Sequence, residues 1–382
     1  MSLHSNSGPI PGRATPEGTR RYAARAPACA GHFRAPDRLL VSSLALGTRQ
    51  GAPGGVDDLL YRSALETLLE AGCNVVDTAL SDRMQTSERA VGAALARAIA
   101  SGLVARDEVV VVTKGGALTA DARFAQTRAE VHRNLVATYL ESGLVDPDRL
   151  VGGHCMQPRF LRDQIARSRA NLGLETIDFY LVQEPELHLR ELGPDGFRDA
   201  LVETFAALED EVAHGHIAAY GVCTWNGFLV PHTEREHLSV FDVFEAALEA
   251  GSGDHHLRAV QMPYGLAVGE GAALASQLSG GATASVVELL VDTGTLVLAS
   301  APLFGGRIVG HVPAFVRAAY PETRGDAQCA LQFARSTHGV STVVVGLREP
   351  AHVDAAVALA RTPPAEPAIA AGLFRAAAAR AR

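Results

Sequence analysis

Lysine is almost absent from this chain of 382 residues, in which lysine and arginine together number 34. The one lysine is Lys114, so arginine supplies nearly all of the positive charge. Arginine keeps its proton at any working pH, whereas a buried lysine can shift its pKa and take part in acid–base chemistry. The exception marks Lys114 as a candidate functional residue, with chance retention as the alternative.

Several other features are scarce, and each absence excludes a class of protein. No apolar run reaches the length of a membrane span. The net charge of -8 lacks the basic footprint of a nucleic-acid-binding protein. The five cysteines lie far apart without a CxxC pair, which argues against zinc and against a disulfide framework. We therefore expect a protein without a metal site, acting on a small molecule rather than on nucleic acid or a membrane.

The two ends of the chain differ in composition from its middle. Residues 1–36 are rich in glycine, proline, arginine and alanine, which predicts a flexible N-terminal arm. Arg20 and Arg21 resemble a twin-arginine signal, but no apolar segment follows them, so we expect a cytoplasmic protein. Residues 37–362 hold the predicted domain, and residues 363–382 form an alanine- and proline-rich tail.

Short apolar runs alternate with amphipathic stretches through this domain, which is typical of repeated βα units. The expected strands are Val41–Leu46, Asn74–Asp77, Glu108–Thr113, Ile177–Val182, Ile217–Val222, Ala259–Met262, Thr295–Ala299 and Thr342–Val345. The expected helices are Leu59–Ala71, Ser87–Ala100, Phe160–Asn171, Phe197–His214, Phe241–Ala250, Ser285–Asp292, Asp326–Thr337 and Pro350–Ala360. Eight strands, each followed by a helix, predict an α/β protein with a (β/α)8 TIM barrel. A doubly wound sheet would need fewer units and usually a GxGxxG turn, which the sequence lacks.

Two connections are longer than ordinary loops. Residues 115–158 follow the third strand and residues 185–196 follow the fourth. Both would leave the C-terminal face of the barrel, where active sites of this fold lie. They are candidate lids or substrate walls, or else surface decoration.

The strand ends carry the candidate chemistry. Asp77 and Lys114 end the neighbouring second and third strands. A carboxylate beside a buried ammonium group keeps both charged or tunes the lysine pKa. Such a pair in a cleft more often marks a functional site than a structural ion pair at the rim.

Motifs in the order of the eight strands resemble those of the aldo-keto reductase family, from about Leu40 to Ala360. They are Ala71–Ala79 with Ser87–Gly92, Val112–Gly116, Asn171–Leu181, Leu208–Gly215 with Ala219–Val222, Val260–Tyr264, Ala299–Leu303 and Val345–Arg348. The segments His154–Met156 and Thr224–Gly227 are similar to a divergent bacterial branch of that family. The resemblance implies the barrel fold and NADPH-dependent reduction of carbonyl compounds.

The family that the chain resembles uses Asp, Tyr, Lys and His. Asp77 and Lys114 match the first and third roles, in which they lower the pKa of the tyrosine. Asp82 stands at the tyrosine position and Gln183 at the histidine position, followed by Glu184. The proton donor and the orienting imidazole are therefore replaced, and Asp82 or Glu184 would have to supply the proton.

Cofactor residues are retained more fully than catalytic ones. Gln261 matches the residue that holds the nicotinamide carboxamide, and Ser300 ends the next strand. The run Leu303, Phe304, Gly305, Gly306 and Arg307 suits a pyrophosphate, because it can present backbone N–H groups. Gly346 and Arg348 resemble an NADP 2′-phosphate site at the start of the last helix. The Glu–Asn pair that the family carries further along is replaced by Ala355 and Ala356.

Three functions remain open from the sequence. The first is NADP(H)-linked reduction or oxidation of a small carbonyl or hydroxyl metabolite with a rewired acid–base site. The second is a lyase, dehydratase, isomerase or cyclase that uses Asp77, Asp82, Lys114 and Glu184 without hydride transfer, with a Schiff base at Lys114 as one variant. The third is a non-catalytic binding or regulatory subunit. The bias from lysine to arginine is compatible with a high-GC bacterium and a specialised metabolic pathway.

Overall fold

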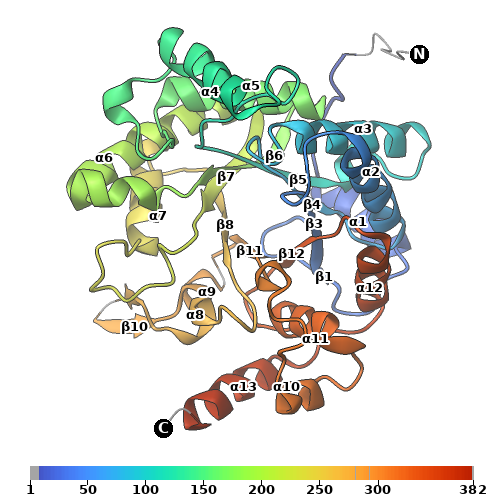
Figure 1. The fold of residues 1–382 in the computed structure, drawn as a ribbon. Helices are drawn as coiled ribbons and strands as arrows, with labels where there is room; N and C mark the ends of the chain where they lie inside the picture. Colours follow the sequence, from blue (N-terminus) through green and yellow to red (C-terminus); the bar gives the residue numbers. More distant parts are fainter. Residues whose placement is uncertain (1–7, 280, 292, 381–382) are drawn as a thin grey trace.

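Eight parallel strands close into a barrel surrounded by helices (Figure 1). The computed structural model describes residues 8–279, 281–291 and 293–380. Around the barrel the strands follow the order β11-β12-β3-β4-β5-β6-β7-β8. Their bounds are β3 Leu44–Gly47, β4 Val75–Asp77, β5 Val110–Gly115, β6 Ile177–Gln183, β7 Ile217–Cys223, β8 Leu257–Pro263, β11 Leu296–Ser300 and β12 Thr342–Gly346. The predicted (β/α)8 barrel is confirmed.

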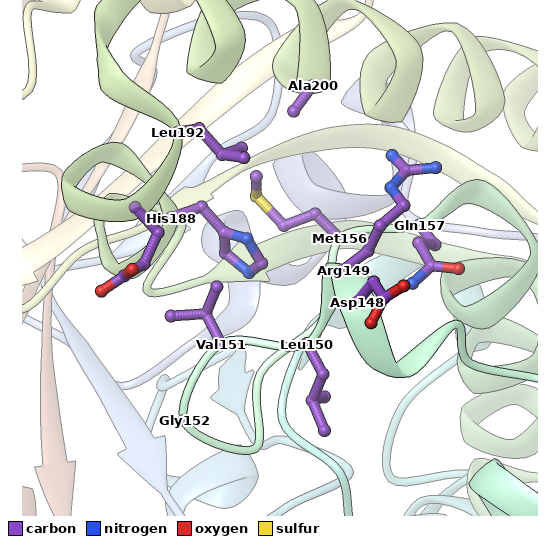
Figure 2. Close-up of a pocket in the computed structure, with 11 residues that line it drawn as sticks. Asp148, Arg149, Leu150, Val151, Gly152, Met156, Gln157, His188, Leu192 and Ala200 are labelled. Atoms are coloured by element: carbon purple, nitrogen blue, oxygen red, sulfur yellow. The ribbon is translucent and has the colours of Figure 1, made fainter.

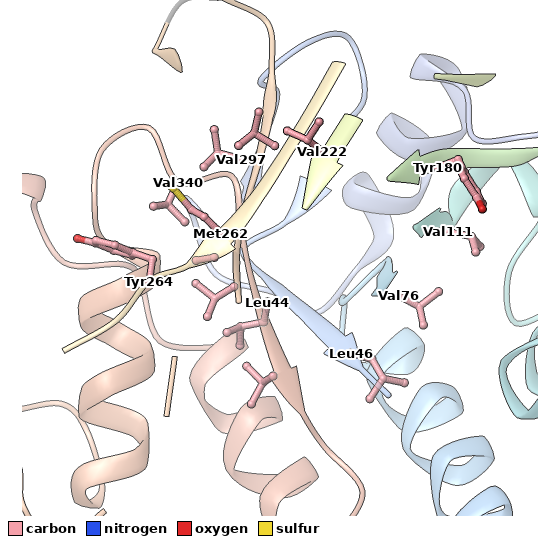
Figure 3. Close-up of a cluster of buried hydrophobic side chains, with 14 of the residues drawn as sticks. Leu44, Leu46, Val76, Val111, Tyr180, Val222, Met262, Tyr264, Val297 and Val340 are labelled. Carbon is pink, nitrogen blue, oxygen red and sulfur yellow. The ribbon is translucent and has the colours of Figure 1, made fainter. Parts of the chain in front are cut away.

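Each strand sends alternate side chains to two different cores. Ala45, Val75 and Leu298 belong to the core inside the barrel. Leu44 and Leu46 flank Ala45 in the chain and pack outward, among the side chains between strands and helices (Figure 3). Burial on both faces explains why the strands read as continuous apolar runs in the sequence.

The helices between the strands lie close to the predicted positions. Those that follow the strands are α2 Gly55–Glu70, α3 Thr86–Ala100, α5 Pro158–Leu172, α6 Glu186–Ala213, α7 Val240–Ala250, α9 Val286–Leu290, α11 Gly325–Arg335 and α12 Pro350–Ala360. Smaller elements are β1 Phe33–Arg34, β2 Val41–Ser42, η1 Arg106–Glu108, α8 Glu270–Ala273, β9 Gln277–Ser279, β10 Ala282–Ala284, η4 Phe304–Gly306 and α10 Ala314–Ala319. The predicted first strand is thus split, because β2 pairs with β1 and only β3 enters the barrel.

The expectation of a flexible N-terminal arm is wrong for its described residues. Helix α1 spans Pro16–Arg25 and begins at Thr15, whose side chain accepts a hydrogen bond from the Gly18 N–H. Tyr22 is buried and donates its hydroxyl proton to the Leu69 carbonyl at 2.5 Å. Arg25 pairs with Glu108 at 2.6 Å. One buried aromatic ring and this ion pair hold a segment whose composition suggested an arm, while residues 1–7 lie outside the described part.

The two long connections and the tail also contain regular structure. Residues 115–158 include α4 Arg128–Leu135, a π-helical turn η2 Val136–Glu141 and η3 Pro147–Arg149, anchored by the fully buried Tyr139. The predicted loop 185–196 is helical, because α6 begins at Glu186 and is only interrupted at Gly193, whose φ is 67°. The predicted tail carries α13 Pro367–Arg380.

Two further observations concern the whole described chain. None of its helices is both long enough and apolar enough to cross a membrane. All five cysteines are free thiols.

Candidate functional site

Asp77, Lys114 and Gln261 form a hydrogen-bonded chain inside the barrel at its C-terminal end. The Lys114 ammonium donates to Asp77 Oδ1 at 2.6 Å and to the Thr78 carbonyl at 2.9 Å. Gln261 Nε2 donates to Asp77 Oδ2 at 3.1 Å. Strands β4 and β8 stand opposite each other in the barrel order, so this chain spans the barrel interior. The predicted pair of Asp77 and Lys114 is therefore present, in a buried position.

The Lys114 ammonium group is held in its charged form. Burial, the largest single effect, lowers the pKa of Lys114, but the charge and hydrogen bond of Asp77 act together with Cys223 and Asp82 and leave the pKa raised. A protonated amine cannot attack a carbonyl carbon, since the nucleophile in Schiff-base chemistry is the neutral amine. The geometry thus favours Lys114 as a hydrogen-bond donor and disfavours the Schiff base considered above.

Asp82 lies buried beside this chain, on the segment between β4 and α3. Its side chain is 8% exposed, and the Thr48 hydroxyl donates to its Oδ2 at 3.0 Å. Burial raises the pKa of Asp82 to about 6, against the opposing effect of Lys114 and with a further rise from Asp77. A carboxylic acid with this pKa can give up or take a proton near neutral pH.

Strained backbone fixes Asp82 in place. Arg83, Met84 and Gln85 follow it with φ of 48°, 51° and 71°, a left-handed conformation that is unfavourable for residues with a side chain. The Arg83 guanidinium holds the turn by pairing with Asp58 and donating to the Ala52 carbonyl. Within the described chain, every non-glycine residue with positive φ except Ser252 follows the C-terminal end of a barrel strand. Such strain collects at functional sites more often than elsewhere.

Gln183 ends β6, the neighbour of the lysine strand β5, and Glu184 directly follows it. The side-chain oxygen of Gln183 accepts a hydrogen bond at 3.2 Å from the hydroxyl of Ser81, the residue before Asp82. Glu184 is half-buried, has a φ of 46°, and donates its N–H to the Cys223 carbonyl at 2.5 Å. The structure therefore brings the five predicted catalytic residues to three adjacent strands.

A buried pair of histidines contacts the backbone of Gln183. His154 Nε2 contacts the Gln183 carbonyl, and His154 Nδ1 lies 2.9 Å from His188 Nε2. A carbonyl only accepts, so His154 must carry its proton on Nε2 and accept on Nδ1 from His188. Burial lowers the pKa of His154 to about 3 and that of His188 to about 4, which keeps both rings neutral. His154 is buried, with 3% of the residue exposed.

A cavity of about 420 Å³ adjoins this pair. Figure 2 shows the imidazole of His188 on its wall, near Met156 and Val151. The cavity lies between the start of α6 and the segment before α5. The predicted long connections thus build a wall beside the barrel mouth.

Two buried acceptors near the polar chain have no hydrogen-bond partner within the described residues. They are Oε1 of Gln261 and Oγ1 of Thr224, which directly follows β7, the neighbour of β8. An unsatisfied buried polar atom costs free energy, about 1–3 kcal/mol. Each could accept a hydrogen bond from an amide N–H₂ group of a ligand, and the carboxamide of a nicotinamide ring carries such a group.

Further predicted cofactor residues lie at and after the end of β11, which is next to β8. Ser300 ends β11 and accepts the Tyr264 N–H at 2.9 Å on its carbonyl. Beyond it lie Leu303 and the exposed Gly305, Gly306 and Arg307, with positive φ and open space at both glycines. A backbone of this kind leaves room for a phosphate to approach the N–H groups.

The last predicted cofactor residues lie at the end of β12. Gly346 is exposed, but the Arg348 guanidinium pairs with Asp57 at 2.9 Å and with Glu349 at 2.8 Å. The Arg348 guanidinium, predicted from the sequence to bind a 2′-phosphate, is therefore already paired with two carboxylates. No group of three or more His, Cys, Asp or Glu side chains suited to a metal ion occurs among the described residues.

A second cavity, of about 520 Å³, opens at the barrel mouth. Arg49 after β3, Glu184 after β6 and Trp225 after β7 line it. It shares Val151 and Glu191 with the cavity beside His188. A small molecule entering the barrel from its C-terminal side would pass through this space, which we call the mouth cavity.

Some residues of the site were not predicted as site residues from the sequence. Thr48, Thr224, His154 and His188 lie in loops or at a helix start, and only their contacts assign them to the site. Thr224 could have been found from its position directly after the fifth barrel strand. The histidines lie in different segments, so no local spacing reveals them.

Comparison with known proteins gives a matching family. Residues 43–230 match the family model described as the Aldo/keto reductase family. This segment covers the barrel from before β3 to beyond β7 and contains Asp77, Asp82, Lys114, Gln183 and Glu184.

Two curated relatives match part of the chain. An NADH-specific methylglyoxal reductase from Escherichia coli (strain K12) is 28% identical over 188 residues, which is 48% of this chain and 48% of the relative. A D-threo-aldose 1-dehydrogenase from Pseudomonas sp is 31% identical over 160 residues, or 42% of each chain. The chain thus spans about half the length of the curated relatives that it matches.

Solved structures share the fold over most of the chain. An aldo/keto reductase from Klebsiella pneumoniae in complex with NADP and acetate has a TM-score of 0.58 at 20% identity, covering 91% of this chain and 96% of its own. A glycerol dehydrogenase from Gluconobacter oxydans has a TM-score of 0.61 at 18% identity, covering 92% and 96%. An aldo-keto reductase from Bacillus halodurans in its holo form has a TM-score of 0.58 at 20% identity, covering 89% and 95%.

Proposed function

We propose, since residues 43–230 match the Aldo/keto reductase family model, that the chain reduces or oxidises a small carbonyl or hydroxyl metabolite with a nicotinamide cofactor. The observation that carries the proposal is the chain of Gln261, Asp77 and Lys114 across the barrel. One end of this chain is an unsatisfied acceptor that fits a carboxamide, and the other is a fixed ammonium group. The bound cofactor would supply or accept the hydride.

Asp82 takes the role of proton donor in this proposal. Its pKa near 6 provides a protonated carboxyl group for a developing alkoxide, and the reverse step would return the proton to the carboxylate. Lys114 stabilises negative charge on the substrate oxygen, and Asp77 keeps Lys114 protonated and in place. Gln183 is available to donate its amide N–H to the carbonyl, because its oxygen already accepts from Ser81.

A non-redox reaction is the second candidate function. The same Asp82 and Lys114 could move a proton without a hydride, as in a dehydratase or isomerase, and the altered tyrosine and histidine positions favour this. The two functions differ in one requirement, since only the first needs a nicotinamide cofactor in the barrel.

Cofactor binding separates the two candidates. We expect NADPH or NADH to bind the purified protein with a micromolar Kd in a fluorescence titration. Gln261→Leu should weaken binding about tenfold or more, because the carboxamide loses its acceptor. Gln126→Leu, at an exposed position before α4, serves as the matched control and should bind as the wild type does.

Arg348→Ala shows which dinucleotide the protein prefers. A loss of NADPH affinity without a change for NADH would place the 2′-phosphate at Arg348, displacing Asp57 or Glu349. Equal affinities of wild type and variant for NADPH would mean that Arg348 stays paired with Asp57 and Glu349 and does not contact the cofactor.

Absence of binding to the wild-type protein at millimolar NADPH and NADH would rule out hydride transfer and leave the non-redox function.

A further inference from the structure

Negative charge predominates around the mouth cavity. Four carboxylates line it, those of Glu184, Glu186, Glu191 and Glu236, against the guanidinium groups of Arg49 and Arg190. Arg190 approaches Glu236 to 4.0 Å, and Arg49 lies close enough to Asp82 to oppose the rise in its pKa. Both cations therefore already have carboxylate neighbours, whereas Glu191 and Glu184 add negative charge beyond these pairs. A concave site lined by one sign of charge raises the local concentration of ligands of the opposite sign.

Glu186 adds an independent indication that a cation belongs here. Its side chain is 6% exposed, and Oε1 accepts N–H groups from Trp225 at 2.6 Å and Asn226 at 3.2 Å. Its second oxygen, Oε2, has no hydrogen-bond partner within the described chain, although the residue lines the cavity. A buried carboxylate oxygen without a hydrogen-bond partner costs free energy, and a positively charged donor forms the strongest hydrogen bond to it.

Trp225 supplies the third element. It is the single tryptophan of the sequence, it lines the cavity, and 40% of the residue is exposed. A large aromatic side chain at a partly open polar site offers its face to a cation, and tryptophan is the best of the aromatic residues in this interaction. Its backbone N–H donates to Glu186, so the backbone of Trp225 and the Glu186 carboxylate are held together, and both residues line the cavity.

We propose that the mouth cavity binds a substrate that carries a protonated amine, such as an amino sugar. The ammonium group lies between Trp225 and the carboxylates of Glu186 and Glu191, and the carbonyl or hydroxyl group points down the barrel toward Lys114 and Asp82. The assignment of the cavity to a substrate rests on the proposed function. Glu184 connects the two regions, because it lines the cavity and directly follows Gln183 at the end of β6.

The single tryptophan makes this proposal directly measurable. Its intrinsic fluorescence would be titrated, without cofactor, with glucosamine, glucose and glucuronic acid, which share a hexose frame and differ in charge. We expect a saturable change with glucosamine, and at least tenfold weaker binding of the other two. Added salt should weaken the glucosamine response, because charges at a partly open site are screened.

Two exposed rim residues provide the test variant. Glu191→Gln with Glu236→Gln should weaken glucosamine binding about three- to tenfold without affecting the fold, since both side chains are exposed. Glu70→Gln, at the exposed end of α2, is the matched control and should leave binding unchanged. Glucuronic acid binding as tightly as glucosamine, no saturable response to glucosamine, or an unaffected double variant would each overturn the proposal. NADPH binding is measured separately, so a failure here with intact NADPH binding removes the substrate class and leaves the proposed function standing.

Discussion

Asp82→Asn is expected to lower the rate of carbonyl reduction by about 10²- to 10⁴-fold, which is the usual contribution of a positioned proton donor. Asn keeps the size of the side chain and can still accept from Thr48, but it has no acidic proton. In the wild type the rate should be constant below pH 6 and fall as the pH rises through the pKa of Asp82, about 6. The residual activity of Asp82→Asn should lack this inflection.

The stability of the same variant supplies an independent check. Because burial raises the pKa of Asp82 from 3.8 to about 6, its ionised form destabilises the folded state above pH 6. The effect is absent below pH 3.8, where both folded and unfolded states are protonated. Asp82→Asn should therefore raise the free energy of unfolding at pH 8, by about 3 kcal/mol at most, and leave it unchanged at pH 3.5.

Urea titrations and pH–rate profiles measure the two effects. Asp199→Asn, on the exposed side of α6, should change neither. An Asp82→Asn enzyme with the wild-type profile would show that another group, such as Glu184, donates the proton.

Lys114→Met is expected to abolish activity and also to destabilise the protein, by about 3–5 kcal/mol, because the buried Asp77 carboxylate loses its partner. The double variant Lys114→Met with Asp77→Leu should recover most of that stability, since an apolar pair can replace a buried ion pair. It should recover no activity. This combination separates a catalytic role of the pair from the purely structural one that the sequence left open.

The barrel contains a matched control for this pair. Arg106 and Asp178 form a second buried ion pair, at 2.9 Å, where β5 and β6 begin. Arg106→Met should cost similar stability and leave kcat unchanged at a temperature where the variant is folded. If the double variant at Lys114 and Asp77 kept wild-type activity, the pair would be structural only.

The sequence was sufficient for the barrel, because each strand is buried on both faces and therefore appears as a short apolar run between turns. It also predicted that Asp77, Lys114 and Gln183 lie at the same end of the barrel, since residues at the ends of barrel strands share one face. It failed at the N-terminus, where Tyr22 and Arg25 anchor a helix through contacts with Leu69 and Glu108. Composition describes the local chain and says nothing of these distant partners.

The hydrogen bonds and ion pairs of the site could not be predicted either, because they join residues far apart in the sequence. Gln261 reaches Asp77 across 184 residues of sequence, and Arg348 is held by Asp57 from the far end of the chain. No periodicity encodes such side-chain pairs. Residues 185–196 were expected to be a long loop, whereas Pro185 precedes α6 and Gly193 only interrupts this helix.

Transfer of the hydride is the most direct test of the proposed redox function. The protein would be incubated with NADPH deuterated at C4 of the nicotinamide and with a panel of aldehydes, aldoses and amino sugars, and the products analysed by mass spectrometry. We expect an alcohol that carries one deuterium for each cofactor oxidised. Turnover that yields products without deuterium, while the cofactor remains reduced, would contradict the proposal and identify the site as one for non-redox acid–base chemistry.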